Sequence, residues 1–249
     1  MNVFDAHFHI IDPAFPLVPN DGFLPDRFTP EDYLAHSSQL NVISGAVVSG
    51  SFQVFDQGYL LHALKKLGNG FVGVTQLPFT VTDEEIVALN SQGVRAVRFN
   101  LKRGGSESVE QLQSFAQRIF DLAGWHVELY VDGKELARLE SVLRDLPAVS
   151  IDHLGLSATG LPALQRLVEG GVRVKATGFG RVDFDVASAI KAIHAINPQA
   201  LMFGTDLPST RAPRLFHPDD LALVIDALGT ASAQQVLWDN AARFYRLAR

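Results

Sequence analysis

Short apolar segments and segments with helical spacing alternate eight times along the sequence, and this alternation limits the fold more than any other feature. The apolar segments, rich in β-branched residues and bounded by turn residues, cover residues 3–7, 45–49, 71–75, 94–99, 127–131, 149–152, 172–177 and 201–205. The helical segments cover residues 30–40, 58–67, 83–91, 109–123, 135–143, 161–169, 185–196 and 219–228. Strands that are apolar throughout suit a parallel sheet with helices on both faces. We therefore expect an α/β fold, a (β/α)8 TIM barrel, with an open doubly wound sheet as the alternative.

Two further segments lie outside this alternation. Residues 10–28 contain four prolines and form a long loop after the first strand, where we expect a lid over the barrel mouth. Residues 231–249 have an amphipathic pattern that predicts an extra C-terminal helix with a packing role. Its inner side would carry Val236, Leu237, Ala241, Phe244, Tyr245 and Leu247. Neither a repeat nor a linker is visible, so we expect residues 1–249 to form a single domain.

The composition argues against several classes of function. A formal net charge of −6 offers no basic surface to a nucleic acid. The sequence has no cysteine, which excludes disulfides, thiolate nucleophiles and cysteine-bound zinc. Every apolar run is too short to cross a membrane, and the first residues lack the pattern of an export signal. We expect a cytoplasmic protein that acts on a small molecule, without nucleic-acid or membrane partners.

Two histidines, His7 and His9, stand two residues apart at the end of the first predicted strand. Side chains two apart in a strand project to the same face, so both imidazoles would point to one place. Two imidazoles at the carboxyl end of a barrel strand can hold a divalent metal or polarise a carbonyl group. A chance pair in a loop is the alternative on these two residues alone, because the pattern is weakly specific.

Polar residues also end the sixth and eighth predicted strands, where His153 and Asp206 stand. The strand ends of a barrel meet at one mouth, so these two side chains would join the histidine pair. Three histidines and one aspartate can bind one metal ion and activate water. The direction of Glu128 in the fifth strand stays open, and His217 would either reach the mouth or cap the following helix.

Four segments have a composition and order that match a known family: residues 4–9 (FDAHFH), 151–155 (IDHLG), 204–208 (GTDLP) and 240–245 (NAARFY). In these segments the sequence resembles the second amidohydrolase family, in particular the branch that contains 2-pyrone-4,6-dicarboxylate lactonase and sugar-acid lactonases. The resemblance implies a TIM-barrel hydrolase in which Asp206 is the general base on the hydrolytic water. It places the three histidines at the substrate carbonyl or at a metal.

The resemblance also implies that Arg98, Tyr130, Lys175 and Arg181 stand at positions that bind a carboxylated substrate. Lys102 or Arg103 would help to bind it, since both lie close to Arg98 in the sequence. A guanidinium has paired donors that fit a carboxylate, which suits Arg98, although a surface salt bridge is the alternative. Lys175 could instead form a structural ion pair with Asp206 or Asp152.

The sequence departs from the binuclear amidohydrolases in lacking a carbamylated lysine and a further metal-binding histidine at a convincing strand end. One divalent metal ion similar to zinc, held by His7, His9, His153 and Asp206, and a metal-free mechanism both agree with the residues. The favoured function is a lactonase for a small carboxylated lactone, such as a 2-pyrone dicarboxylate or a sugar-acid lactone. A mononuclear metal-dependent decarboxylase or hydratase is the alternative, and ligand binding without catalysis is the least favoured. The oligomeric state is not predicted.

Overall fold

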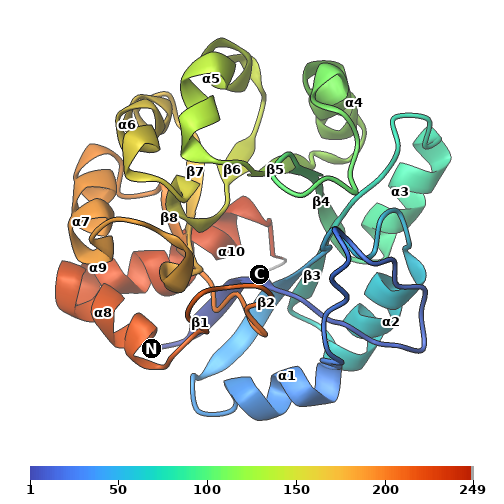
Figure 1. The fold of residues 1–249 in the computed structure, drawn as a ribbon, viewed down its shortest axis with the longest axis horizontal. Helices are drawn as coiled ribbons and strands as arrows, with labels where there is room; N and C mark the ends of the chain where they lie inside the picture. Colours follow the sequence, from blue (N-terminus) through green and yellow to red (C-terminus); the bar gives the residue numbers. More distant parts are fainter. Residues whose placement is uncertain (248–249) are drawn as a thin grey trace.

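The computed structural model describes residues 1–247 as a barrel of eight parallel strands, hydrogen-bonded in sequence order from β1 to β8 (Figure 1). The strands are β1 Val3–Phe8, β2 Val42–Val48, β3 Phe71–Thr75, β4 Val94–Asn100, β5 His126–Tyr130, β6 Val149–Ile151, β7 Arg173–Ala176 and β8 Leu201–Phe203. The segment after β8 closes the barrel onto β1, because the Asp206 amide donates to the His7 carbonyl and the His9 amide to the Leu207 carbonyl, both at 2.7 Å. The predicted (β/α)8 barrel is therefore confirmed, and the open sheet is excluded.

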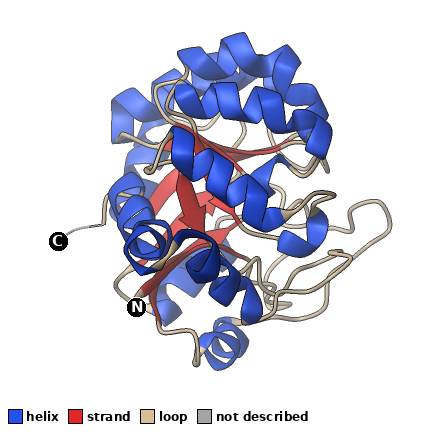
Figure 2. Ribbon diagram, turned by 90° about the vertical axis from the view of Figure 1, so that its left-hand side faces the viewer, coloured by secondary structure: helices blue, strands red, loops and turns tan. Residues whose placement is uncertain are grey.

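Helices connect the strands and surround them on the outside (Figure 2). They are α1 Pro30–Ser37, α2 Gly58–Leu67, α3 Asp83–Ser91, α4 Leu112–Ala123, α5 Leu136–Asp145, α6 Leu161–Glu169, α7 Val186–Ile196 and α8 Asp219–Leu228. The side chains of Thr29 and Thr82 cap α1 and α3, each in a reciprocal capping box. Within the described part of the chain, every helix is too short or too polar to cross a membrane.

Some element boundaries differ from the predicted ones. The helix predicted over residues 109–123 begins as a 3-10 turn, Val109–Gln111, and becomes α-helical only at Leu112. The strand predicted over residues 201–205 ends at Phe203, since the Thr205 amide donates to the side chain of Asp5 at 2.8 Å instead of a neighbouring strand. The site residues after β8 are therefore held by a side chain and by loop contacts.

The C-terminal segment closes one end of the barrel. Its helix runs through α9 Thr230–Gln234, a π-helical turn Gln235–Asp239 and α10 Asn240–Phe244, while residues 248–249 of the predicted helix lie outside the described residues. Tyr245 is fully buried, stacks on Phe4 of β1 with ring centroids 5.1 Å apart, and donates a hydrogen bond to the Ala6 carbonyl at 3.3 Å. The predicted packing role of this segment agrees with these contacts.

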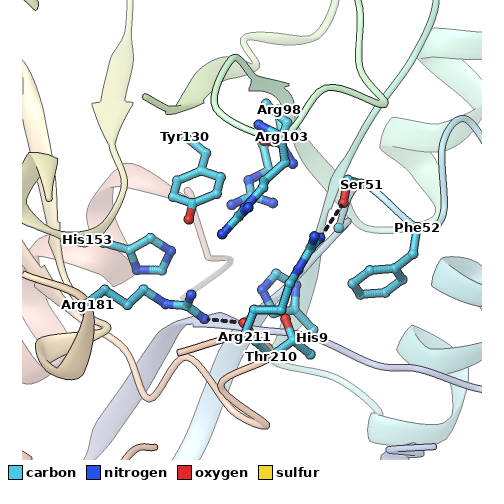
Figure 3. Close-up of a pocket in the computed structure, with 12 residues that line it drawn as sticks. His9, Ser51, Phe52, Arg98, Arg103, Tyr130, His153, Arg181, Thr210 and Arg211 are labelled. Carbon is cyan, nitrogen blue, oxygen red and sulfur yellow. Dashed lines mark hydrogen bonds between the residues drawn. The ribbon is translucent and has the colours of Figure 1, made fainter. Parts of the chain in front are cut away.

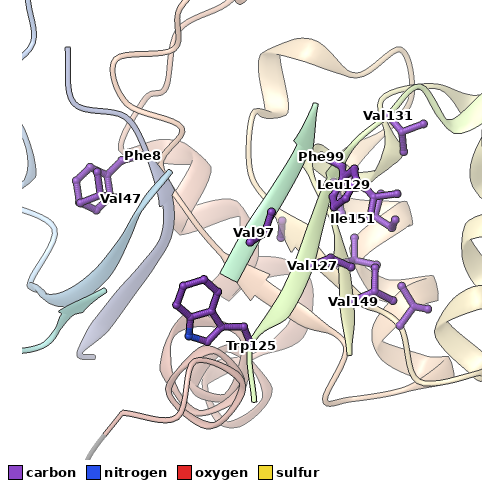
Figure 4. Packing of buried hydrophobic residues seen from close by; sticks show 14 of the residues in the cluster. Phe8, Val47, Val97, Phe99, Trp125, Val127, Leu129, Val131, Val149 and Ile151 are labelled. Atoms are coloured by element: carbon purple, nitrogen blue, oxygen red, sulfur yellow. The ribbon is translucent and has the colours of Figure 1, made fainter. Parts of the chain in front are cut away.

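Apolar side chains form two layers of core. The larger layer lies between strands and helices and includes Phe8, Val97 and Leu129 (Figure 4). The smaller layer lies around the C-terminal segment and includes small residues such as Ala46 and Ala96. Burial of this apolar surface supplies the main driving force for folding. The barrel interior also encloses charged residues, which belong to the site described next.

The proline-rich loop after β1 reaches the barrel mouth. Its ends pair through the backbone of Ile11 and Phe28, at 2.7 and 2.8 Å. The Asn20 side chain near the tip accepts a hydrogen bond from the Arg211 guanidinium at 2.9 Å and donates to the Arg103 carbonyl at 3.0 Å. The loop therefore contributes to the rim, where we predict a lid.

Candidate active site

Three histidine side chains converge on one carboxylate at the carboxyl ends of the strands. The Nε2 atoms of His7, His9 and His153 each lie 3.9 Å from Oδ1 of Asp206. All four side chains are buried. Residues from β1, from the turn after β6 and from the turn after β8 thus meet at one point, which we call the histidine–aspartate centre.

Two of the imidazoles have a hydrogen-bond partner at Nδ1, which leaves their Nε2 atoms to face the centre. His9 Nδ1 lies 2.7 Å from the Val48 carbonyl oxygen, and His153 Nδ1 lies 2.7 Å from the Thr177 hydroxyl oxygen. Gly178 adopts a left-handed conformation beside His153, where a Cβ atom would stand only 2.7 Å from that Nδ1. The glycine therefore permits the close approach of loop and imidazole.

Asp206 uses its two oxygens differently. Oδ2 accepts a hydrogen bond from Arg181 Nε at 2.7 Å, whereas Oδ1 is buried without a hydrogen-bond partner among residues 1–247. Burial raises the pKa of Asp206, and Arg181 opposes this shift. A carboxylate with a raised pKa is better matched to proton transfer near neutral pH.

Positive φ angles mark two residues of the centre, 51° at His153 and 62° at Asp206. This conformation costs roughly 1–2 kcal/mol for a residue with a Cβ atom, and it persists only where surrounding contacts impose it. The hydrogen bond from the Asp206 amide to His7 is one such contact. Two residues of the centre therefore carry backbone strain, among ten described non-glycine residues with a positive φ angle.

Asp5 ties the two strand ends of the centre together. Its Oδ1 accepts from the amides of His7 and Thr205 at 3.2 and 2.8 Å, and its Oδ2 accepts from the hydroxyls of Thr205 and Tyr33 at 2.7 and 3.0 Å. Full burial nevertheless raises the pKa of Asp5 to about 6. Asp5 is a positioning residue that sequence reasoning did not select.

A second layer of charged groups lies beneath the centre in the barrel interior. The Lys175 ammonium donates to Glu128 and lies 3.3 Å from His7 Nδ1 and 3.7 Å from Asp152 Oδ1. The other Asp152 oxygen accepts from Nε and Nη2 of Arg98 at 3.1 and 2.9 Å. Glu128, whose direction the sequence left open, therefore points inward.

The pocket above the centre is lined by four arginines (Figure 3). Its lining consists of His9, Gly50, Ser51, Phe52, Arg98, Asn100, Arg103, Tyr130, His153, Arg181, Thr210 and Arg211. Arg98 is held by Asp152, and Arg181 by Asp206. Within residues 1–247, Arg103 and Arg211 form no ion pair with a carboxylate. This part of the pocket, the arginine wall, thus presents positive charge that the described protein does not neutralise.

The predicted substrate-binding residues divide into two groups. Arg98, Arg103, Tyr130 and Arg181 line the pocket. Lys102 and Lys175 are absent from that lining, since Lys102 pairs with Asp132 at 2.9 Å and Lys175 is enclosed beneath the centre. His217 is exposed beside Asp219 at the start of α8, which agrees with its capping alternative.

Besides Asp5, sequence reasoning missed Asp152 and Arg211 as residues of the site. Asp152 stands directly before His153 in the same motif, and both lie in the turn after β6, where the alternation of strand faces no longer applies. Arg211 lies in the loop after β8, where its guanidinium donates to Asn20 and to the Ser51 hydroxyl at 3.3 Å. The sequence did offer one signal for Arg211, since a cationic residue in a loop that follows a barrel strand lies on the active face of the barrel.

The donor atoms fit a divalent metal ion by type and spacing. Ligand atoms of His7, His9 and Asp206 lie within 4.8 Å of one another, and so do those of His7, Asp152 and His153. Imidazole nitrogen and carboxylate oxygen are ordinary zinc ligands. The unpartnered Asp206 Oδ1 and His7 Nε2 face the same space. The described residues can therefore hold a metal ion at the centre.

Several known proteins are similar to this chain in sequence or in fold. A 2-pyrone-4,6-dicarboxylate hydrolase of Comamonas testosteroni is 30% identical over 156 residues, which are 61% of this chain and 51%, about half, of that protein. A 4-sulfomuconolactone hydrolase of Rhizobium radiobacter is 26% identical over 97% of this chain and 89% of its own length. The apo crystal structure of an Agrobacterium tumefaciens protein shares the fold, with a TM-score of 0.85 at 22% identity over 99% of this chain and 96% of that one. The amidohydrolase family model matches residues 4–247, so the chain belongs to the amidohydrolase family.

Proposed function

We propose that this protein hydrolyses a small carboxylated lactone at the histidine–aspartate centre. The observation that carries the proposal is the unpartnered Asp206 Oδ1, which three imidazole Nε2 atoms surround at 3.9 Å. Hydrolysis by activated water has two requirements. One is a basic oxygen that takes a proton from the water, and the other is a set of nitrogen atoms that can contact the carbonyl oxygen. The names of two relatives, hydrolases of a pyrone dicarboxylate and of a sulfomuconolactone, support a lactone substrate.

Asp206 acts as general base in this proposal. Its Oδ1 takes a proton from water while the water oxygen attacks the lactone carbonyl carbon. The carbonyl oxygen gains negative charge and is stabilised by hydrogen-bond donors of the centre. The ring C–O bond then breaks, and the proton passes from Asp206 to the leaving oxygen, which yields a hydroxy acid.

The arginine wall binds the substrate carboxylate. Arg103 and Arg211 carry positive charge without a carboxylate partner in the described chain, and a guanidinium can form paired hydrogen bonds to a carboxylate. Tyr130 and Arg98 would also contribute, since both line the pocket and the guanidinium lies 5.1 Å from the tyrosine ring centroid. The distance between wall and centre would select lactones with a suitably placed acid.

A metal ion would be held by His7, His9 and Asp206, as an ion similar to zinc. When bound, it would polarise the carbonyl and lower the pKa of water. His153 and the arginines would orient the substrate in either case. We further propose that residues 1–249 act as one catalytic domain in the cytoplasm.

A panel assay tests this proposal. We expect the purified protein to open carboxylated five- and six-membered lactones and to leave neutral lactones of the same ring size almost unchanged. Each reaction is run with and without a chelator, and released carbon dioxide and water addition to double bonds are measured in parallel. Turnover limited to decarboxylation or hydration would contradict lactone hydrolysis and favour the alternative reaction class.

A further inference from the structure

His7 and His9 differ in the group that lies next to Nδ1, which is a hydrogen-bond donor at His7 and an acceptor at His9. His9 Nδ1 faces the Val48 carbonyl oxygen at 2.7 Å, and His7 Nδ1 faces the Lys175 ammonium at 3.3 Å. Each neutral imidazole has one N–H donor and one lone pair. The partner of Nδ1 therefore decides what Nε2 presents to the centre.

The partner of His9 can only accept. A carbonyl oxygen has no proton, so Nδ1 of His9 must carry the hydrogen and Nε2 must carry the lone pair. His9 thus offers an acceptor to the centre.

The nearest partner of His7 Nδ1, the Lys175 ammonium, can only donate, although Asp152 Oδ1 also lies 3.5 Å from that atom. The Lys175 ammonium is fully buried between the carboxylates of Glu128 and Asp152. A charged ammonium has three donors and no acceptor, so it can contact Nδ1 of His7 only through the lone pair of that atom.

We propose that Lys175 is a positioning residue that keeps the proton of His7 on Nε2, so that His7 donates to the ligand while His9 accepts from it. In the proposed hydrolysis, His7 would donate to the developing oxyanion, and His9 would accept a hydrogen bond from the attacking water. The roles of His7 and His9 in hydrolysis rest on the proposed function. The positions of their protons do not, because they can be measured in the protein without substrate.

The same arrangement weakens metal binding through His7. A metal ion binds a nitrogen lone pair, and at Nε2 of His7 this requires the proton to move to Nδ1, facing the Lys175 ammonium. Asp152 Oδ1 lies 3.5 Å from Nδ1 and could accept that proton once the ammonium is removed. Lys175 therefore favours donation by His7 over metal binding.

Nitrogen-15 NMR of the histidine rings in the intact wild-type protein tests the proton positions directly. His7→Gln and His9→Gln variants assign the two signals. We expect His7 in the neutral form protonated on Nε2 and His9 in the neutral form protonated on Nδ1. Finding the His7 proton on Nδ1 overturns the proposal, whether or not any lactone is hydrolysed.

A double variant tests the role of the lysine. Lys175→Met with Glu128→Gln removes the buried ion pair together, and Lys66→Met with Glu31→Gln removes an exposed pair, 3.6 Å apart, as the control. We expect the buried double variant to bind zinc about 10- to 100-fold more tightly than wild type, which is the size of effect that groups behind metal ligands have on metal affinity. The control should match wild type. Unchanged zinc affinity in a folded Lys175→Met, Glu128→Gln double variant contradicts the proposal. If that double variant does not fold, the NMR result on the wild-type protein decides.

Discussion

The residues of the histidine–aspartate centre stand on strands or in the tight turns directly after them, whereas three of the four arginines that face them stand in longer connections. His7 belongs to β1 and His9 follows it, and backbone hydrogen bonds join this strand to the turn that carries Asp206. Arg103 and Arg211 depend on loop contacts such as those with Asn20. The centre is thus fixed by the barrel, while the arginine wall is adjustable.

This difference suggests a division of roles, in which the histidine–aspartate centre carries out the reaction and the arginine wall selects the substrate. Positions at strand ends are held by the sheet and allow little variation, whereas loops tolerate change. We expect substitutions in the centre to lower kcat and substitutions in the wall to raise KM. The following four variants test this division, from the largest expected effect to the smallest.

Asp206→Asn removes the base of the centre. We expect kcat for a lactone to fall about 10²- to 10⁴-fold, the usual contribution of general base catalysis. The amide oxygen of the substituted side chain can still accept a hydrogen bond from Arg181, so thermal unfolding should show a folded protein. A folded variant with a nearly wild-type rate would remove Asp206 from the mechanism.

Asp5→Asn tests the support of the centre through pH. The folded pKa of Asp5, about 6, is above its ordinary value of 3.8, so the folded state binds the proton more tightly than the unfolded state between these pH values. The contribution of Asp5 to stability is therefore largest below pH 4 and is lost as pH rises through 6. At about 1.4 kcal/mol per pKa unit, the loss is about 3 kcal/mol.

The measurement for Asp5 is the free energy of unfolding in urea at several pH values. Relative to Asp5→Asn, wild type should lose stability between about pH 4 and pH 6. Lys66→Met, at an exposed pair, serves as the control for general effects of pH. Parallel profiles for wild type and Asp5→Asn would show that burial does not shift this carboxyl group.

Arg211→Met tests the arginine wall. Hydrogen bonds to a charged group contribute about 1.5–3 kcal/mol, so we expect kcat/KM for a carboxylated lactone to fall about 10- to 100-fold. The loss should appear mainly in KM. Arg138→Met, an exposed arginine paired with Glu135 on the surface, is the matched control. A loss confined to kcat would place Arg211 in the chemical step instead.

Lys102→Met should have the smallest effect. Lys102 pairs with Asp132 outside the pocket lining, and an exposed ion pair contributes about 0–1 kcal/mol to stability. Activity on the lactone panel and the midpoint of thermal unfolding should both stay close to wild type. A large rise in KM would return Lys102 to the substrate-binding residues predicted from the sequence.

The barrel could be predicted because each βα unit has its own local signals. Apolar runs, helix periodicity and the capping boxes at Thr29 and Thr82 depend on neighbours in the chain. The convergence of His7, His153 and Asp206 followed from the fold, since strand ends of a barrel share one mouth. Loop paths are set by contacts between distant residues, so the place of Arg211 could not be predicted in the same way.

The sequence alone determined the eightfold strand and helix order, the residue types of the centre and the absence of cysteine ligands. Only the tertiary structure decided that Lys175 lies behind His7 instead of in the pocket, and that Asp152 pairs with Arg98. The reason is physical. Periodicity gives the direction of a side chain relative to its own strand, whereas its charge partner, burial and proton position depend on which other strands face it.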